Sequence, residues 1–225
     1  MSLIQRKPRP ILSRDKDPDQ LRDTRLFIVA CDDKHAPKQY FGFFRLPRVV
    51  VKVVETADGT SVAEHVLTRL MEFDYEPDDE LWMLLDTDHM LERNHIRGFL
   101  RALRNAKRRG VQIAISRPSF ELWLLLHHEP EQAVKHLTSA SETESALRNA
   151  LGEYNKVLLK ETDFPLNTIV TACQRAIRLD ERKAELIPRS VGSRVYRLWL
   201  SIAKKTMVSE LPPELLGLVP IANED

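Results

Sequence analysis

Glycine and cysteine are scarce in this chain, and a long apolar run is missing. Only 7 glycines occur among 225 residues, and no glycine-rich phosphate loop is present, which argues against a P-loop NTPase or a Rossmann nucleotide binder. The two cysteines, Cys31 and Cys173, fit no metal-ligand spacing or disulfide framework, which favours a reducing compartment. No apolar run approaches the roughly 20 residues that span a bilayer, and the first residues lack a signal-peptide core. We therefore expect a cytoplasmic protein with no membrane partner.

The composition is that of an ordinary globular protein. Hydrophobic residues make up 43% of the chain and charged residues 30%, which is enough for one good core and a smaller appended unit. The net charge is +1, so the overall charge does not identify a polyanionic partner. Local clusters of charge must carry that inference.

Short apolar segments alternate with helical patterns in the first half of the chain. The predicted strands are residues 26–31, 49–54, 81–85 and 111–115. Helical patterns lie between them, the longest over residues 91–109 and ending at Gly110. This alternation predicts an α/β fold in which a mostly parallel sheet is flanked by helices. We assign this domain to residues 25–137, preceded by a flexible arm over residues 1–24.

Strand patterns stop after residue 130, and helical patterns replace them. The predicted helices are residues 146–159, 166–186 and 193–203. Ser61 and Ser141 each precede a glutamate by three residues, which predicts two capping boxes. We expect a C-terminal helical subdomain over residues 138–210, packed on the sheet, and a frayed tail over residues 211–225.

Acidic residues follow three of the four predicted strands. Asp32 and Asp33 follow the first strand, Asp86 and Asp88 end the third, and Glu121 comes just after the fourth. The carboxyl ends of parallel strands share one edge, so these side chains can converge. Carboxylate oxygens suit Mg²⁺ or Mn²⁺, and such a cation assists attack on a phosphate. The alternative is that these residues cap turns and helices without any catalytic role.

Arginines recur along one side of the helix predicted over residues 91–109. They are Arg93, Arg97, Arg101, Arg104 and Arg108, at intervals of four, four, three and four. This spacing places them on one stripe, which could follow the phosphate backbone of a nucleic acid. The alternative is a solvated basic face on an ordinary amphipathic helix.

Three segments have a distinctive order and spacing. They are Phe-Ile-Val-Ala-Cys at residues 27–31 with the acid and Tyr-Phe that follow, Leu-Trp-Met-Leu-Leu-Asp-Thr-Asp at residues 81–88, and Ser-Arg-Pro-Ser-Phe-Glu-Leu-Trp-Leu-Leu-Leu-His at residues 116–127. Together they resemble the RloB-like family of bacterial phage-defence (abortive-infection) proteins, which carry a TOPRIM-type catalytic domain. A weaker match lies at residues 189–198, and the resemblance spans about residues 25–200.

The resemblance implies a TOPRIM-like fold and Mg²⁺-dependent cleavage of RNA or DNA in phage defence, often beside an ATPase of the AAA or ABC type. Carried over, Asp32 takes the acid/base role, while Asp86 and Asp88 bind the metal. Glu121 matches the Phe-Glu-Leu-Trp segment, where it would serve the site or orient its ligands. The sequence leaves open whether the protein forms a homodimer.

The first motif departs from the family pattern Cys-Glu-Gly-Glu-Lys-Thr-Glu-Pro-x-Tyr-Phe. Here Asp32 replaces a glutamate, Asp33 replaces the glycine and Pro37 replaces another glutamate. A shift of about 1 Å in a catalytic group can lower a rate on the order of a hundredfold. Either Asp32 and Asp33 jointly replace the glutamates, or the site binds metal and barely cleaves, as a regulatory module would. A purely structural α/β subunit is the third reading.

Overall fold

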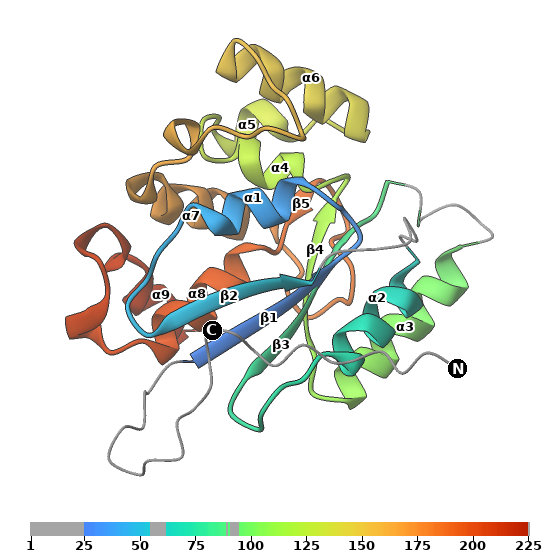
Figure 1. Ribbon diagram of the computed structural model, residues 1–225. Coiled ribbons are helices and arrows are strands. Elements are labelled where there is room, and N and C mark those ends of the chain that lie inside the picture. The colour runs from blue at the N-terminus through green and yellow to red at the C-terminus, as the bar shows by residue number, and fades with distance from the viewer. Residues whose placement is uncertain (1–24, 55–61, 89, 91–94, 225) are drawn as a thin grey trace.

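The computed structural model describes residues 25–54, 62–88, 90 and 95–224 (Figure 1). The predicted N-terminal arm, Ser61 and Arg93 lie outside the described residues. Within the described part of the chain, no helix has the length and apolar character needed to cross a membrane.

One five-stranded sheet organises the molecule, in the order β2-β1-β3-β4-β5. The strands are β1 Arg25–Cys31, β2 Val49–Val54, β3 Glu80–Asp86, β4 Gln112–Arg117 and β5 Gly192–Ser193. The first four are parallel, whereas β5 runs antiparallel to β4. The predicted α/β fold and its four parallel strands are confirmed. β5 was not predicted, because two small residues carry no β-branched or alternating pattern.

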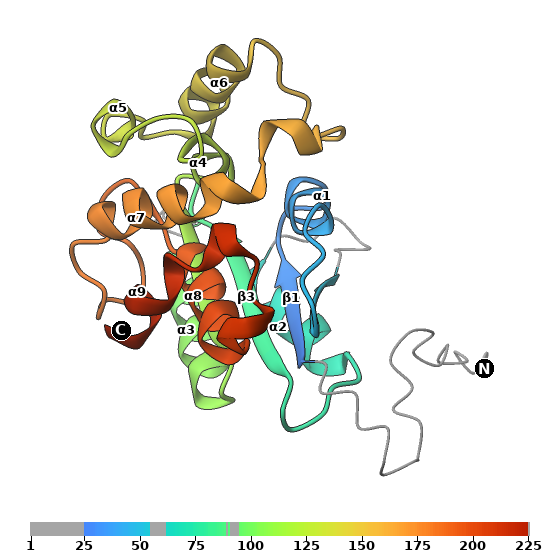
Figure 2. The same ribbon diagram turned by 90° about the vertical axis from the view of Figure 1, so that its left-hand side faces the viewer.

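Helices lie on both faces of the sheet (Figures 1 and 2). The α-helices are α1 Ala36–Gly42, α2 Ala63–Glu72, α3 Ile96–Arg108, α4 Glu121–Leu125, α5 Glu131–Val134, α6 Ala140–Leu151, α7 Ile169–Leu179, α8 Tyr196–Lys205 and α9 Leu218–Glu224. Short 3₁₀ helices are η2 Glu161–Asp163, η3 Leu166–Thr168, η4 Val208–Glu210 and η5 Pro213–Leu215. Helices α4 to α6 lie beyond the carboxyl ends of the strands in both views.

Two cores form on opposite faces, because strand side chains alternate. In β1, Leu26 and Ile28 pack with α2 and α3, while Phe27 and Val29 pack with the other helices. The core that contains Phe27 and Val29 also includes buried residues from α1 through to α9. The helical C-terminal region therefore shares its core with the sheet.

Two local expectations were wrong. The expected tail is packed, with Leu215, Leu218 and Ala222 buried around α9. The capping box of α6 begins at Ser139, not Ser141. Periodicity locates an apolar face well but fixes a helix end poorly.

Candidate functional site

Five acids stand at the carboxyl ends of the central strands. Asp32 and Asp33 directly follow β1, Asp86 is the last residue of β3 with Asp88 two positions later, and Glu121 opens α4. We call these five residues the acidic rim. Strands β1, β3 and β4 are neighbours in the sheet, so the sequence-predicted acids come from adjacent strand ends.

Hydrogen bonds fix the position of these strand ends. The main-chain N–H of Asp86 donates to Oδ2 of Asp32 at 2.9 Å, which joins the ends of β1 and β3. The N–H groups of Thr87 and Asp88 both donate to the carbonyl of Pro118, at 3.0 and 3.1 Å. The turn after β4 therefore holds the segment that carries the metal-binding pair predicted from the sequence.

Charge is crowded at the acidic rim. Burial, reinforced by the charge of Asp33 and opposed by the N–H of Asp86, raises the pKa of Asp32 to about 7. Burial also raises the pKa of Asp86 well above its ordinary value, and the charges of Asp32 and Glu121 add to the effect. A raised carboxyl pKa means that the charged form is disfavoured at this place. A cation bound at the rim would relieve that strain.

A lysine already neutralises part of the rim. Nζ of Lys156 lies 2.7 Å from Oδ2 of Asp33 and 3.3 Å from Oε1 of Glu121. Burial alone would lower the pKa of Lys156, but the charges of these two acids raise it above its ordinary value. The hydroxyl of Tyr154 donates to the same Glu121 oxygen at 3.0 Å. Lys156 therefore lies on the Asp33–Glu121 side of the rim.

The rim has the oxygen donors of a magnesium or manganese site, but these donors are not arranged around a common point. Within the described residues, no three Asp, Glu, His or Cys side chains are arranged to hold a metal ion. All five rim side chains are carboxylates, and the hydroxyls of Thr87 and Ser119 are buried without a hydrogen-bond partner among the described residues. Hard oxygen donors suit Mg²⁺ and Mn²⁺. A cation would have to draw these carboxylates together.

Arg97, Arg101, Arg104 and Arg108 lie exposed along α3, as the spacing predicts. Arg101 pairs with Glu64 of α2 at 3.0 Å, and its side chain is 69% exposed. Because α3 follows β3, the stripe runs from the side of the acidic rim toward the amino ends of the strands.

Sequence reasoning missed Lys156 and Tyr154, because the pattern predicted a helix through residue 159. The structure ends α6 at Leu151, where Gly152 takes a φ of 77°, a conformation that favours glycine. Gly152 was thus the available signal. The segment that follows is anchored by Gln39 of α1, which bonds the carbonyl of Lys156 and the N–H of Leu159 at 3.0 and 2.9 Å.

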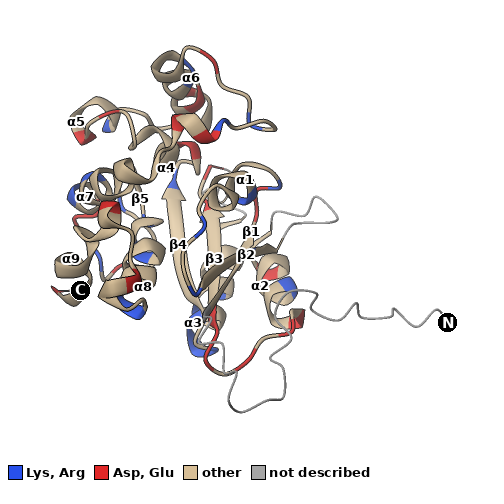
Figure 3. Ribbon diagram, turned by 60° about the vertical axis from the view of Figure 1, so that its left-hand side comes forward, with Lys and Arg blue, Asp and Glu red and all other residues tan. Residues whose placement is uncertain are grey.

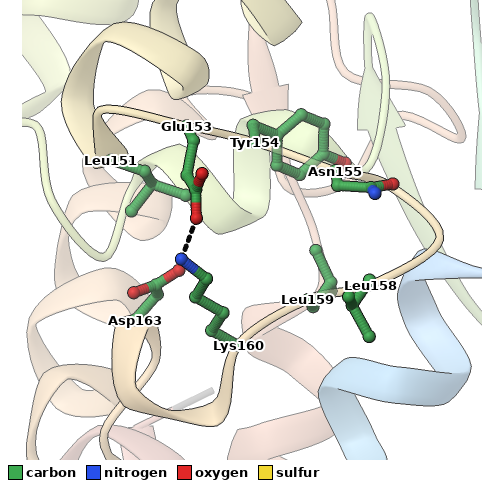
Figure 4. A pocket seen from close by; sticks show the side chains of 8 residues that line it. All are labelled: Leu151, Glu153, Tyr154, Asn155, Leu158, Leu159, Lys160 and Asp163. Carbon is green, nitrogen blue, oxygen red and sulfur yellow. Dashed lines mark hydrogen bonds and ion pairs between the residues drawn. The ribbon is translucent and has the colours of Figure 1, made fainter.

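A pocket of about 240 Å³ lies under this segment (Figure 4). Tyr154 and Asn155 border one side, and the ion pair of Glu153 with Lys160 borders another. Tyr154 also reaches Glu121, so it connects the pocket wall to the acidic rim. Tyr154 and Lys156 thus connect residues 152–160 to the acidic rim.

His127 is a buried, neutral histidine with a structural role. Burial lowers its pKa to about 3, so the ring is neutral. Its two nitrogens lie 3.0 Å from the Tyr40 hydroxyl and 2.6 Å from the Thr168 hydroxyl. The ring ties α1, the end of α4 and η3 together beneath the site.

Comparison with known proteins gives a family and nothing finer. A model of the family described as RloB-like protein matches residues 27–201. No curated protein and no solved structure matches the chain. The matched residues run from within β1 into α8 and include the acidic rim and Lys156. This chain belongs to the RloB-like protein family.

Proposed function

We propose that this chain is a divalent-cation-dependent nuclease that acts on RNA or DNA as an effector of phage defence. The observation that carries the proposal is the contact between the ends of β1 and β3, where Asp32 accepts the N–H of Asp86 within a crowded acidic rim. The motif resemblance supplies the defence context. Mg²⁺ or Mn²⁺ is the proposed cofactor.

Each rim residue has a role that suits its surroundings. Asp86 and Asp88 would hold the cation, which when bound supplies charge neutralisation at the phosphate and a more acidic water. Asp32, with a pKa of about 7, is suited to take a proton from the attacking water and return it. Asp33 adds negative charge beside it, and Glu121, held by Tyr154, orients the rim.

Substrate contacts fit the basic stripe of α3. Arg97, Arg101, Arg104 and Arg108 are exposed, and their spacing suits a phosphate backbone without sequence preference. Since Arg101 is shared with Glu64 on the surface, that ion pair is weak enough to be exchanged for a phosphate.

The test is cleavage of mixed tRNA and of plasmid DNA with Mg²⁺ or Mn²⁺. Wild type is compared with Asp86→Asn and with Glu214→Gln, which removes a charge from an exposed residue outside the rim. We expect cleavage by wild type and by the control variant, and loss of on the order of a hundredfold or more for Asp86→Asn. Equal activity in all three preparations would exclude the rim as the active site.

Lys156 favours a second candidate, a catalytically degenerate module that partners an ATPase. Its ammonium already pairs with Asp33 and Glu121, so two acids are neutralised without a metal. This reading predicts weak metal binding and little loss of phage protection in Asp32→Asn. Loss of protection in that variant, with normal folding by circular dichroism, supports the nuclease instead.

A further inference from the structure

A broad groove lies beside β4, at the edge of the sheet farthest from β2. Its volume is about 880 Å³, and α3 and α8 flank it along the amino-terminal half of β4 (Figure 3). Its walls include Glu80 and Gln112 at the starts of β3 and β4, the loop at residues 183–186, and Arg197 and Lys204 of α8. The groove is thus at the end of the strands opposite the acidic rim.

The groove is positively charged. Six lysines and arginines line it, against two glutamates. Arg194 and Arg197 are balanced by Asp180, and Glu80 is bonded by Lys205 and by Ser201 at 2.8 Å. These pairs are internal to the groove and do not include Lys107 or Lys204.

Lys107 and Lys204 are exposed on opposite walls and have no salt-bridge partner among the residues that the structure describes. Lys107 belongs to the last turn of α3 and Lys204 to the last turn of α8. The groove therefore offers its surplus positive charge to a ligand from outside the described chain.

The floor of the groove includes the first half of β4, whose groove side has no strand partner among the described residues. The carbonyl of Ile115 accepts the N–H of Arg194 at 2.9 Å, whereas the carbonyl of Ser116 accepts the N–H of Thr87 at 3.1 Å. Successive residues of β4 therefore direct their main-chain groups to opposite sides, and Ile113 directs its own toward the groove, as Ile115 does. In the described chain, β5 pairs with β4 only at Ser116 and Arg117.

We propose that this groove binds an extended acidic peptide segment of a partner protein, which adds as a strand beside the first half of β4. Main-chain N–H and C=O groups of β4 would pair with the peptide backbone, and Lys107 and Lys204 would pair with its acidic side chains. A phosphodiester backbone has no N–H groups to match this edge. The groove also begins at Glu80, about 20 Å from Asp86 at about 3.3 Å per strand residue, so it is remote from the proposed cleavage site.

Lysines beside an open edge have a simpler use, which is to prevent strands of other molecules from pairing there. The experiment must therefore separate a docking site from a protected edge. It uses the full chain in buffer with EDTA, so the outcome is independent of metal-dependent cleavage. The probes are a fluorescein-labelled Glu-Val-Glu-Val-Glu-Val peptide, its Lys-Val counterpart, the Glu-Val peptide with N-methylated valines, and a labelled dT6 oligonucleotide.

Fluorescence anisotropy should show saturable binding of the Glu-Val peptide and at least about tenfold weaker binding of the Lys-Val and N-methylated peptides. Lys204→Glu and Lys107→Glu should each weaken binding of the Glu-Val peptide about fivefold or more. Lys135→Glu, which reverses an exposed charge at the end of α5, should leave it unchanged.

Three results would overturn the proposal. Equal binding of the N-methylated peptide would show that charge alone holds the ligand. Preferential binding of dT6 that depends on Lys204 would make the groove a phosphate-binding surface. Absence of binding by all four probes would leave the lysines as protection of the strand edge.

Discussion

Two groups of acids in this protein have opposite electrostatic settings. At the acidic rim, the half-buried Asp32 and Asp86 lie beside other carboxylates, and their pKa values are raised. At the end of α7, Asp180 is buried, and Arg194 reaches both of its oxygens at 2.9 Å. Burial alone would raise the pKa of Asp180, yet the hydrogen bonds and charge of Arg194 bring it below its ordinary value.

The difference separates an acid that is paired within the fold from acids that crowd one another. Tyr196 and Arg197 add further bonds to Asp180, at 2.9 and 3.1 Å, so this carboxylate is satisfied inside the chain. At the rim, Lys156 pairs with Asp33 and Glu121, and that lysine side chain is 43% exposed. Acids that a fold uses for stability come with their cations, whereas crowded acids destabilise a fold unless something binds them.

The strongest way to break this comparison is Asp180→Asn. The change leaves the Arg194 guanidinium, whose side chain is 2% exposed, without a counter-charge. We expect the free energy of unfolding to fall by about 3 to 5 kcal/mol, the usual loss when one partner of a buried ion pair is removed. Urea denaturation followed by circular dichroism measures it. A loss below about 1 kcal/mol would place Asp180 among ordinary surface acids.

Asp32→Asn should have the opposite sign. At pH 8 the wild-type side chain is charged against an environment that raises its pKa to about 7, and asparagine can still accept the N–H of Asp86. We expect the metal-free variant to be more stable than wild type by about 1 to 2 kcal/mol. Its affinity for Mg²⁺, measured by calorimetry, should fall about tenfold or more. Destabilisation comparable to that of Asp180→Asn would mean that Asp32 is structural.

The sequence predicts the sheet and the convergence of acids for a clear physical reason. The β-branched run that forms β2 and the apolar run that forms β3 are local signals, and parallel strands must share one carboxyl edge. That reasoning places Asp32 and Asp86 on the same edge of the sheet, and the structure makes β1 and β3 neighbours. The outcome is their hydrogen bond across the sheet.

Lys156 was beyond such reasoning. It reaches the rim from a loop 35 residues after Glu121 in sequence, through tertiary packing that no periodicity encodes. Strand β5 could not be predicted for the same reason. Gly192 and Ser193 form a strand because they pair with β4. Both features depend on contacts between residues far apart in the sequence, which local propensity does not predict.

The next prediction concerns pH. Asp32 must lose its proton before it can face a cation, so the affinity for Mg²⁺ should rise with pH up to about 7 and then level off. Below pH 7 the affinity should fall up to about tenfold per pH unit. Calorimetric titration at pH 6, 7 and 8 measures this, and Asp32→Asn should show a flatter dependence.

The same proton has a defined effect on stability. Between the ordinary value of 3.8 and the folded value of about 7, the folded state binds more protons at Asp32 than the unfolded state does. Its contribution to the free energy of unfolding therefore declines as pH rises from about 4 to about 7. His127, with a pKa of about 3 when folded, acts in the opposite direction between pH 3 and 6.5. The difference between wild type and Asp32→Asn isolates the Asp32 effect, and an equal pH dependence in both would contradict it.

The smallest expected effect comes from Lys156→Met. Because the lysine side chain is 43% exposed, its ion pairs with Asp33 and Glu121 should stabilise the metal-free fold by less than about 1 kcal/mol. Removal of the ammonium also removes a competitor for the same oxygens, so we expect Mg²⁺ to bind about threefold to tenfold more tightly. Calorimetry and urea denaturation provide the two measurements.

Lys160→Met is the matched control, because Lys160 lies in the same segment but pairs with Glu153 outside the rim. It should leave the affinity for Mg²⁺ unchanged. If Lys156→Met instead weakens Mg²⁺ binding, the lysine positions the acids for the metal and does not compete with it for their oxygens. The rim would then resemble the Asp180 cluster, with its cation built into the fold, and the contrast between the two buried acid sites would be one of degree.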